Sequence, residues 1–111
     1  MREPINPTLY VIVRRDLSET YRMVQGAHGV ASFALKEPEQ LKEWKNGYIC
    51  FLSVFNGLAL KELNRTLQSK DIHPAHFIEP DLSDAGELTS LVLFENGSGV
   101  VKKALKNLPL A

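Results

Sequence analysis

The sequence predicts an α/β fold: a single domain with a four-stranded mixed sheet and helices on both faces. Short runs rich in β-branched and aromatic residues alternate with longer segments in which apolar residues recur at helical spacing. The length of 111 residues, with 44% hydrophobic and 23% charged, is ordinary for one globular domain. We therefore expect residues 1–111 to form one domain with the element order βααβαββα.

The first half of the chain is predicted to supply a strand, two helices and a second strand. Leu9 to Val13 is typical of a buried strand, and Ser18 or Thr20 can cap the helix that follows. The predicted apolar face of this helix consists of Met23, Ala27, Val30, Ala31 and Ala34. A shorter helix starts after Pro38, and the two helices should be nearly continuous on one side of the sheet. Tyr48 to Phe55 is predicted to be a central strand.

The second half is predicted to add a helix, two strands and a final helix. Asn56 and Gly57 lead into a helix that suits the cover of a sheet. The leucines that should face the sheet are Leu58, Leu60, Leu63 and Leu67. Residues 73–80 form a third short strand, and Leu88 to Glu95 form the fourth after a polar loop. A turn and a helix then close the chain.

Composition and charge narrow the class of protein. No apolar run approaches the ~18 residues that span a bilayer, and the N-terminal residues lack the apolar core of a secretory signal, so we expect a cytoplasmic protein without a membrane partner. Cys50 is expected to be a small core residue. His73 and His76 lack an Asp or Cys at supporting spacing, so neither a metal nor another cofactor is expected. Because 13 basic and 13 acidic residues cancel, any surface that binds nucleic acid must be local.

One flank of the first helix carries an amide and an imidazole beside the apolar face. At about 100° per residue, this flank consists of Tyr21, Gln25, His28, Gly29 and Ser32. Such a flank faces a groove or a polar contact. Glutamine and histidine at such a boundary are more often hydrogen-bonded structural groups than catalysts, so periodicity alone does not decide their role.

Two motifs and the order of the elements give the chain a resemblance to a known family. Val13 to Leu17 reads VRRDL, and Gln25 to His28 reads QGAH, in agreement with R-x-D-L and A-Q-x-x-H-A patterns. With EPEQLKEW and the late LVLF, the chain resembles the type 2 peptidyl-tRNA hydrolase family. The later segments EPDL and ELT also resemble a divergent set of bacterial and phage hydrolase-like proteins. The resemblance implies an α/β fold and cleavage of the ester between a peptide and the terminal ribose of tRNA.

The resemblance also implies which residues form the site. The site glutamine is Gln25, and the acid in the loop after the third strand is Asp81 or Glu79. Where the family has a lysine, four residues before the glutamine, this chain has Tyr21, followed by Arg22. A tyrosine could donate a hydrogen bond to an oxyanion, and a guanidinium could hold phosphate and stabilise negative charge.

Five further residues are expected to contact substrate. Thr89 would line the groove, and His28 would lie at the site or pack beneath it. Arg14 and Arg15 could grip phosphate together with the arginine of the helix, although a solvated strand end is the other interpretation. Ser98 precedes the last helix, where backbone N–H groups could bind an anion or form a plain cap.

We therefore expect a hydrolase of peptidyl-tRNA, with tRNA or peptidyl-tRNA as partner. The alternative is a catalytically inactive relative that acts as an RNA-binding or dimeric interaction module. A homodimer would use an apolar strip on the two N-terminal helices, for which a core role is the other interpretation. The strip consists of Phe33, Leu35, Leu41 and Trp44.

Overall fold

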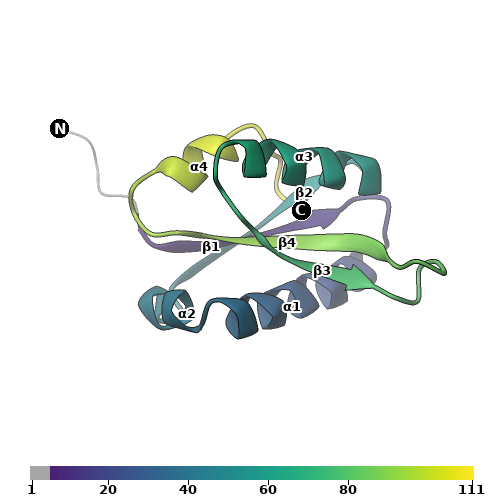
Figure 1. Cartoon of the computed structure of the whole chain (residues 1–111), viewed down its shortest axis with the longest axis horizontal. Coiled ribbons are helices and arrows are strands. Elements are labelled where there is room, and N and C mark those ends of the chain that lie inside the picture. The colour runs from purple at the N-terminus through teal and green to yellow at the C-terminus, as the bar shows by residue number, and fades with distance from the viewer. Residues whose placement is uncertain (1–5) are drawn as a thin grey trace.

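The computed structural model describes residues 6–111, and its element order is the predicted one (Figure 1). The elements are β1 (Thr8–Arg14), α1 (Glu19–Lys36), α2 (Pro38–Trp44), β2 (Tyr48–Val54), α3 (Gly57–Ser69), β3 (Ala75–Glu79), β4 (Glu87–Glu95) and α4 (Val100–Ala104). Residues 1–5 lie outside the described part. They belong to the predicted domain and to the N-terminal stretch that is expected to lack a secretory signal. No helix in that part is long and apolar enough to cross a membrane.

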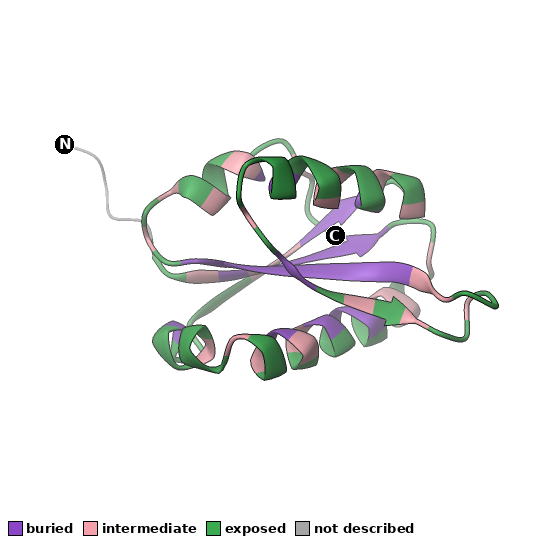
Figure 2. Ribbon diagram, viewed as in Figure 1, coloured by how far each residue is buried: buried purple, intermediate pink, exposed green. Residues whose placement is uncertain are grey.

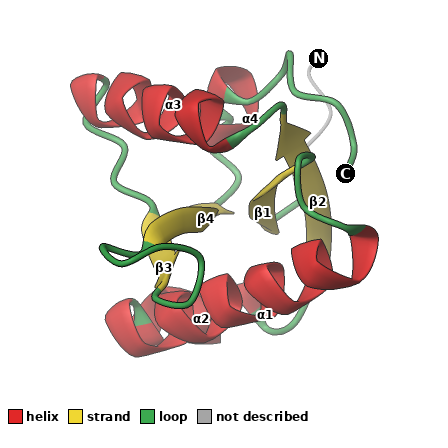
Figure 3. Cartoon of the chain, turned by 90° about the vertical axis from the view of Figure 1, so that its right-hand side faces the viewer, coloured by secondary structure: helices red, strands yellow, loops and turns green. Residues whose placement is uncertain are grey.

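The four strands form one mixed sheet in the order β2-β1-β4-β3. β1 pairs in parallel with β2 and antiparallel with β4, and β3 pairs antiparallel with β4. α1 and α2 cover one face of this sheet, and α3 and α4 cover the other (Figures 1 and 3). The predicted α/β class, with helices on both faces, is confirmed.

The prediction that β2 is a central strand was wrong, because β2 lies at an edge of the sheet. β2 can be apolar at an edge of the sheet because the C-terminal residues cover part of it. The backbone N–H of Ser53 donates to the carbonyl of Pro109, and the N–H of Ala111 donates to that of Phe51. These bonds pair the C-terminal residues with the far half of β2, which is the half that is buried.

Two hydrophobic clusters hold the helices to the sheet, and the buried positions concentrate in the strands between them (Figure 2). The cluster under α3 and α4 contains Ile12, Leu52, Val54, Leu60, Leu67, Leu88, Leu91, Leu93 and Leu105. The cluster under α1 and α2 contains Leu9, Val11, Val13, Phe33, Trp44, Ala75, Val92 and Phe94. Phe33 and Trp44 therefore belong to the core, and the strip proposed for a dimer is not a continuous surface.

The buried face of α1 differs from the predicted one. Met23 is 62% exposed, and Ala27 and Ala31 are exposed too. The residues that face the sheet are Gln25, Gly26, Gly29 and Phe33. A Cβ at Gly29 would lie 2.5 Å from Ser90 Oγ, so the helix lies as close to the sheet as its glycines allow. The spacing of the apolar residues predicted the wrong face, because the face that packs on the sheet is defined by small residues that allow close approach and not by large apolar side chains.

The two long helices begin at side-chain caps, and Ser18 is one of the two residues predicted to cap α1. Ser18 Oγ accepts a hydrogen bond from the N–H of Tyr21 at 3.2 Å, and Asn56 Oδ1 accepts one from Ala59 at 2.9 Å. Of the leucines predicted to cover the sheet from α3, Leu58 is 69% exposed, so that part of the prediction was wrong. It lies in the first turn of α3, on the side that faces solvent.

Candidate functional site

A β-bulge in β4 aims a hydroxyl at α1. The pairing with β3 shifts between Phe77, which is opposite Ser90, and Ile78, which is opposite Leu88, so Thr89 is an extra residue on β4. In regular alternation Leu88 would share a face with Ser90, but it packs in the cluster on the opposite side. The bulge therefore allows the adjacent hydroxyls of Thr89 and Ser90 both to reach α1.

Both hydroxyls bind Gln25, whose side chain is fully buried. Thr89 Oγ1 donates to Gln25 Oε1 at 2.6 Å, and Ser90 Oγ donates to the Gln25 carbonyl at 2.8 Å. Gln25 Nε2 in turn donates to Glu79 Oε1 at 3.3 Å. A buried amide is thus hydrogen-bonded at both ends and joins the bulge of β4 to the end of β3.

The carboxylate of Glu79 is held by two donors from α1. Tyr21 Oη donates to Glu79 Oε1 at 3.1 Å, the same oxygen that accepts from Gln25. Burial, the hydrogen bond to Glu79 and the negative charges of Glu79 and Asp81 all raise the pKa of Tyr21. The tyrosine hydroxyl therefore stays protonated and donates.

Of the two candidate acids, Glu79 is the one that contacts the other site residues. It is half-buried at the end of β3 and touches both Tyr21 and Gln25. Asp81 is exposed in the loop beyond and acts on Tyr21 only through its charge. We call Tyr21, Gln25, Glu79 and Thr89 the Glu79 cluster.

His28 lies further along the same flank of α1 and stacks on a strand residue. Its ring is 4.4 Å from that of Phe77, centroid to centroid, with 10° between the planes. The histidine itself is exposed. The flank predicted from the sequence therefore faces both β3 and β4, with the Glu79 cluster at one end and this aromatic pair next to it.

Thr89→Val should test the hydrogen bond that holds Gln25. Valine has nearly the shape of threonine, but it leaves the buried Gln25 Oε1 without its donor at 2.6 Å. We expect the free energy of unfolding to fall by about 1–3 kcal/mol, as measured by urea denaturation. Thr89→Ser, which keeps the hydroxyl, should lose less, and equal losses in the two variants would contradict this account.

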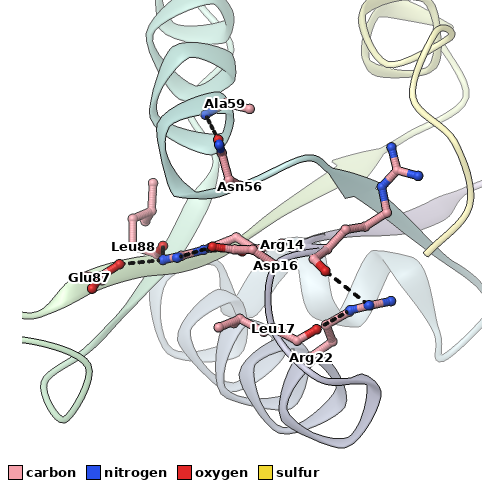
Figure 4. Close-up of polar contacts among 9 residues, drawn as sticks. Arg14, Asp16, Leu17, Arg22, Asn56, Ala59, Glu87 and Leu88 are labelled. Atoms are coloured by element: carbon pink, nitrogen blue, oxygen red, sulfur yellow. Dashed lines mark hydrogen bonds and ion pairs between the residues drawn. The ribbon is translucent and has the colours of Figure 1, made fainter.

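Arg14 is buried and is bound by the protein's own carboxylates (Figure 4). Its Nε and Nη2 donate to the two oxygens of Asp16 at 3.0 and 2.8 Å, and Nη1 donates to Glu87 Oε1 at 2.9 Å. Nη1 also donates to the carbonyl of Leu88 at 3.1 Å. The hydrogen bond from Arg14 lowers the pKa of Asp16, so both stay charged. Arg14 therefore ties the end of β1 to the start of β4, and its charge is neutralised within the fold.

The other two arginines of the predicted basic group point to different surroundings. Arg22 Nε donates to the carbonyl of Leu17 at 2.8 Å, and Nη2 donates to that of Arg15 at 3.2 Å, so Arg22 holds the loop before α1 (Figure 4). Arg15 is exposed. The structure therefore separates Arg14 from Arg15 and Arg22, which remain at the surface beside the start of α1.

Ser98 lies in the loop between β4 and α4, at the opposite end of β4 from Thr89 of the Glu79 cluster. The backbone donors expected to bind an anion there are occupied by the buried carboxylate of Glu95. It accepts from Gly97 at 2.7 Å and Gly99 at 3.0 Å through Oε2, and from Lys102 at 2.9 Å through Oε1. Burial alone would raise the pKa of Glu95, but these N–H groups outweigh it and lower the pKa.

The remaining titratable candidates stand apart from the cluster. His73 Nε2 lies 2.8 Å from Asp71 Oδ1 at the surface, and residues 6–111 contain no group of three His, Cys, Asp or Glu side chains placed to hold a metal ion. Cys50 is half-buried, and burial raises the pKa of its thiol. Cys50 therefore stays protonated near neutral pH and is a poor nucleophile.

Several residues that matter in the structure were not singled out from the sequence. Phe77 was only a member of the predicted third strand, and Asp16 and Glu87 were given no role of their own, although the structure places Phe77 on His28 and both acids on Arg14. The one available signal was the VRRDL motif, in which an arginine precedes an aspartate by two residues. Glu95 carried no local signal, since a buried carboxylate is recognised only from its surroundings.

Comparison with known proteins extends the description of the fold. No protein-family model matches the chain, and no curated protein matches it. A solved structure of a protein of unknown function from Agrobacterium tumefaciens is similar to it, with a TM-score of 0.68 and 16% sequence identity. The match covers 96% of this chain and 98% of that chain. At this identity the likeness concerns the fold alone, and it extends over nearly the whole chain.

Proposed function

We propose that this protein hydrolyses the ester bond of peptidyl-tRNA or of a related acylated RNA, with Glu79 as the general base. The observation that carries the proposal is the way the Glu79 carboxylate is held. Tyr21 and Gln25 both donate to Oε1, while Oε2 has no hydrogen-bond partner in residues 6–111. A half-buried carboxylate with one oxygen anchored and one available is suited to orient and deprotonate a water molecule.

Water and the ester are the only reactants in the proposed reaction, and Glu79 transfers the proton between them. Glu79 Oε2 takes a proton as the water oxygen bonds to the ester carbonyl carbon, which leaves a tetrahedral oxyanion. The oxyanion collapses, the bond between that carbon and the ribose oxygen breaks, and the ribose oxygen receives the proton from Glu79. The products are an intact tRNA and a peptide with a free carboxyl group, which releases its remaining proton to water.

The remaining members of the Glu79 cluster position the base. Gln25 is fully buried, so it orients Glu79 rather than touching the substrate, and Thr89 fixes the amide in turn. Tyr21 is half-buried and lies at the surface of the cluster. Its hydroxyl, kept protonated by a raised pKa, can turn from the carboxylate to the developing oxyanion.

A second candidate function is RNA binding without turnover. Tyr21 in place of the family lysine removes a positive charge from the site, and Arg14 is neutralised by two carboxylates. The exposed Arg15 and the surface Arg22 would then provide the local contact with phosphate.

Deacylation of peptidyl-tRNA by the purified protein tests the proposal. With label in both the peptide and the tRNA, we expect release of peptide in proportion to protein concentration, with full-length tRNA recovered. Saturable, salt-sensitive binding of tRNA without release would favour the second candidate. Neither release nor binding at low salt would contradict both.

A further inference from the structure

The aromatic pair beside the Glu79 cluster has one ring face turned to solvent. Phe77 covers one face of the His28 imidazole at 4.4 Å and 10°, yet His28 is exposed. In the described part of the chain no hydrogen bond ties the imidazole to another group. The ring is thus held flat by stacking alone, with an open face of the kind on which a further planar ring can stack.

The His28–Phe77 pair also lies close enough to Glu79, the proposed general base, for one nucleotide to reach both. His28 follows Gln25 by three residues on the flank of α1, and Phe77 precedes Glu79 by two residues on the same face of β3. Alternate residues of a strand are about 6–7 Å apart. That separation is comparable to the span of one ribose, from the oxygen that carries the ester to the nucleobase.

We propose that His28 stacks on the nucleobase of the 3′-terminal nucleotide, the one whose ribose carries the ester. This inference rests on the proposed function and names a subsite within it. The charge nearby favours a nucleobase over a phosphate, because Glu79 lies two residues from Phe77 on β3 and its carboxylate would repel an anion. Stacking on an aromatic ring accepts any base, since every base has a π face, so this contact would read the RNA end without reading its sequence.

Fluorescence of a short single-stranded RNA with 2-aminopurine as its 3′-terminal base tests the subsite directly. The wild-type protein should quench the fluorescence saturably, because stacking quenches this base. His28→Ala should weaken the apparent affinity about tenfold, and His28→Phe, which keeps a ring on Phe77, should restore most of it. His76→Ala is the matched control, since His76 is an exposed histidine of β3 one residue before Phe77 and so on the opposite face.

The possible outcomes separate this inference from the proposed reaction. Quenching that depends on the ring at position 28 supports the subsite, even if peptidyl-tRNA is not hydrolysed. No quenching by the wild type, or equal quenching by wild type and His28→Ala, would overturn the subsite even if hydrolysis occurs. Circular dichroism and thermal unfolding should match between His28→Ala and wild type, because the replaced ring is exposed.

Discussion

Replacing Glu79 by glutamine is expected to lower the rate of peptidyl-tRNA deacylation by at least about 100-fold. The amide has the size of the carboxylate, and its oxygen can still accept from Tyr21 and Gln25, so the fold and the position of the side chain should be kept. What is lost is the ability to take a proton from water. Deacylation should be measured under single-turnover conditions, where chemistry rather than product release sets the rate.

Two aspartates in the loop after β3 provide control variants for Glu79→Gln. Asp84→Asn, an exposed control that removes the same charge, should leave the rate close to that of the wild type. Asp81→Asn should have a small effect, because Asp81 acts on the cluster only through its charge on Tyr21. A large loss in Asp81→Asn together with an active Glu79→Gln would assign the base to Asp81 instead.

The largest effect on stability is expected from Glu95→Ala. This change removes the acceptor for the backbone N–H groups of Gly97, Gly99 and Lys102 in a position where the carboxylate is fully buried. We expect the free energy of unfolding to fall by about 2–4 kcal/mol, because the donors lose a charged partner and α4 loses its N-terminal anchor. Urea denaturation measures the loss, and Glu43→Ala, at an exposed glutamate of α2, should change it little.

The contribution of Glu95 should also depend on pH in a defined direction. Because the folded pKa lies below the ordinary value of 4.5, the stabilisation is complete above that value and is lost as pH falls through the folded pKa. The difference in unfolding free energy between wild type and Glu95→Ala should therefore be constant from pH 7 to pH 5 and shrink below about pH 4. A difference that grows on acidification would contradict the role assigned to this carboxylate.

The order of elements and the helix starts could be predicted because their signals are local. Ser18 and Asn56 cap the helices they precede, and the β-rich runs became strands. The edge position of β2 could not be predicted, because it depends on the C-terminal residues that pair with it. The buried face of α1 was misjudged for a related reason, since its glycines signal close packing only once the sheet beneath them is known.

The candidate site was predictable in its residue types but not in its connections. The resemblance singled out Gln25 and left Glu79 and Asp81 as alternatives, because the loop can be aligned in more than one way. The choice follows from where β3 ends and from the bulge at Thr89, and both are properties of strand pairing. Arg14 could not be assigned from sequence either, since its partner Glu87 lies 73 residues away.

Single-turnover deacylation in water enriched in oxygen-18, with protein in excess over peptidyl-tRNA, tests the central claim most directly. If Glu79 activates water for attack on the ester carbonyl, the peptide released in that single turnover should carry one labelled oxygen in its carboxylate. The tRNA should carry none. No release of peptide, or an unlabelled carboxylate in the released peptide, would contradict the account.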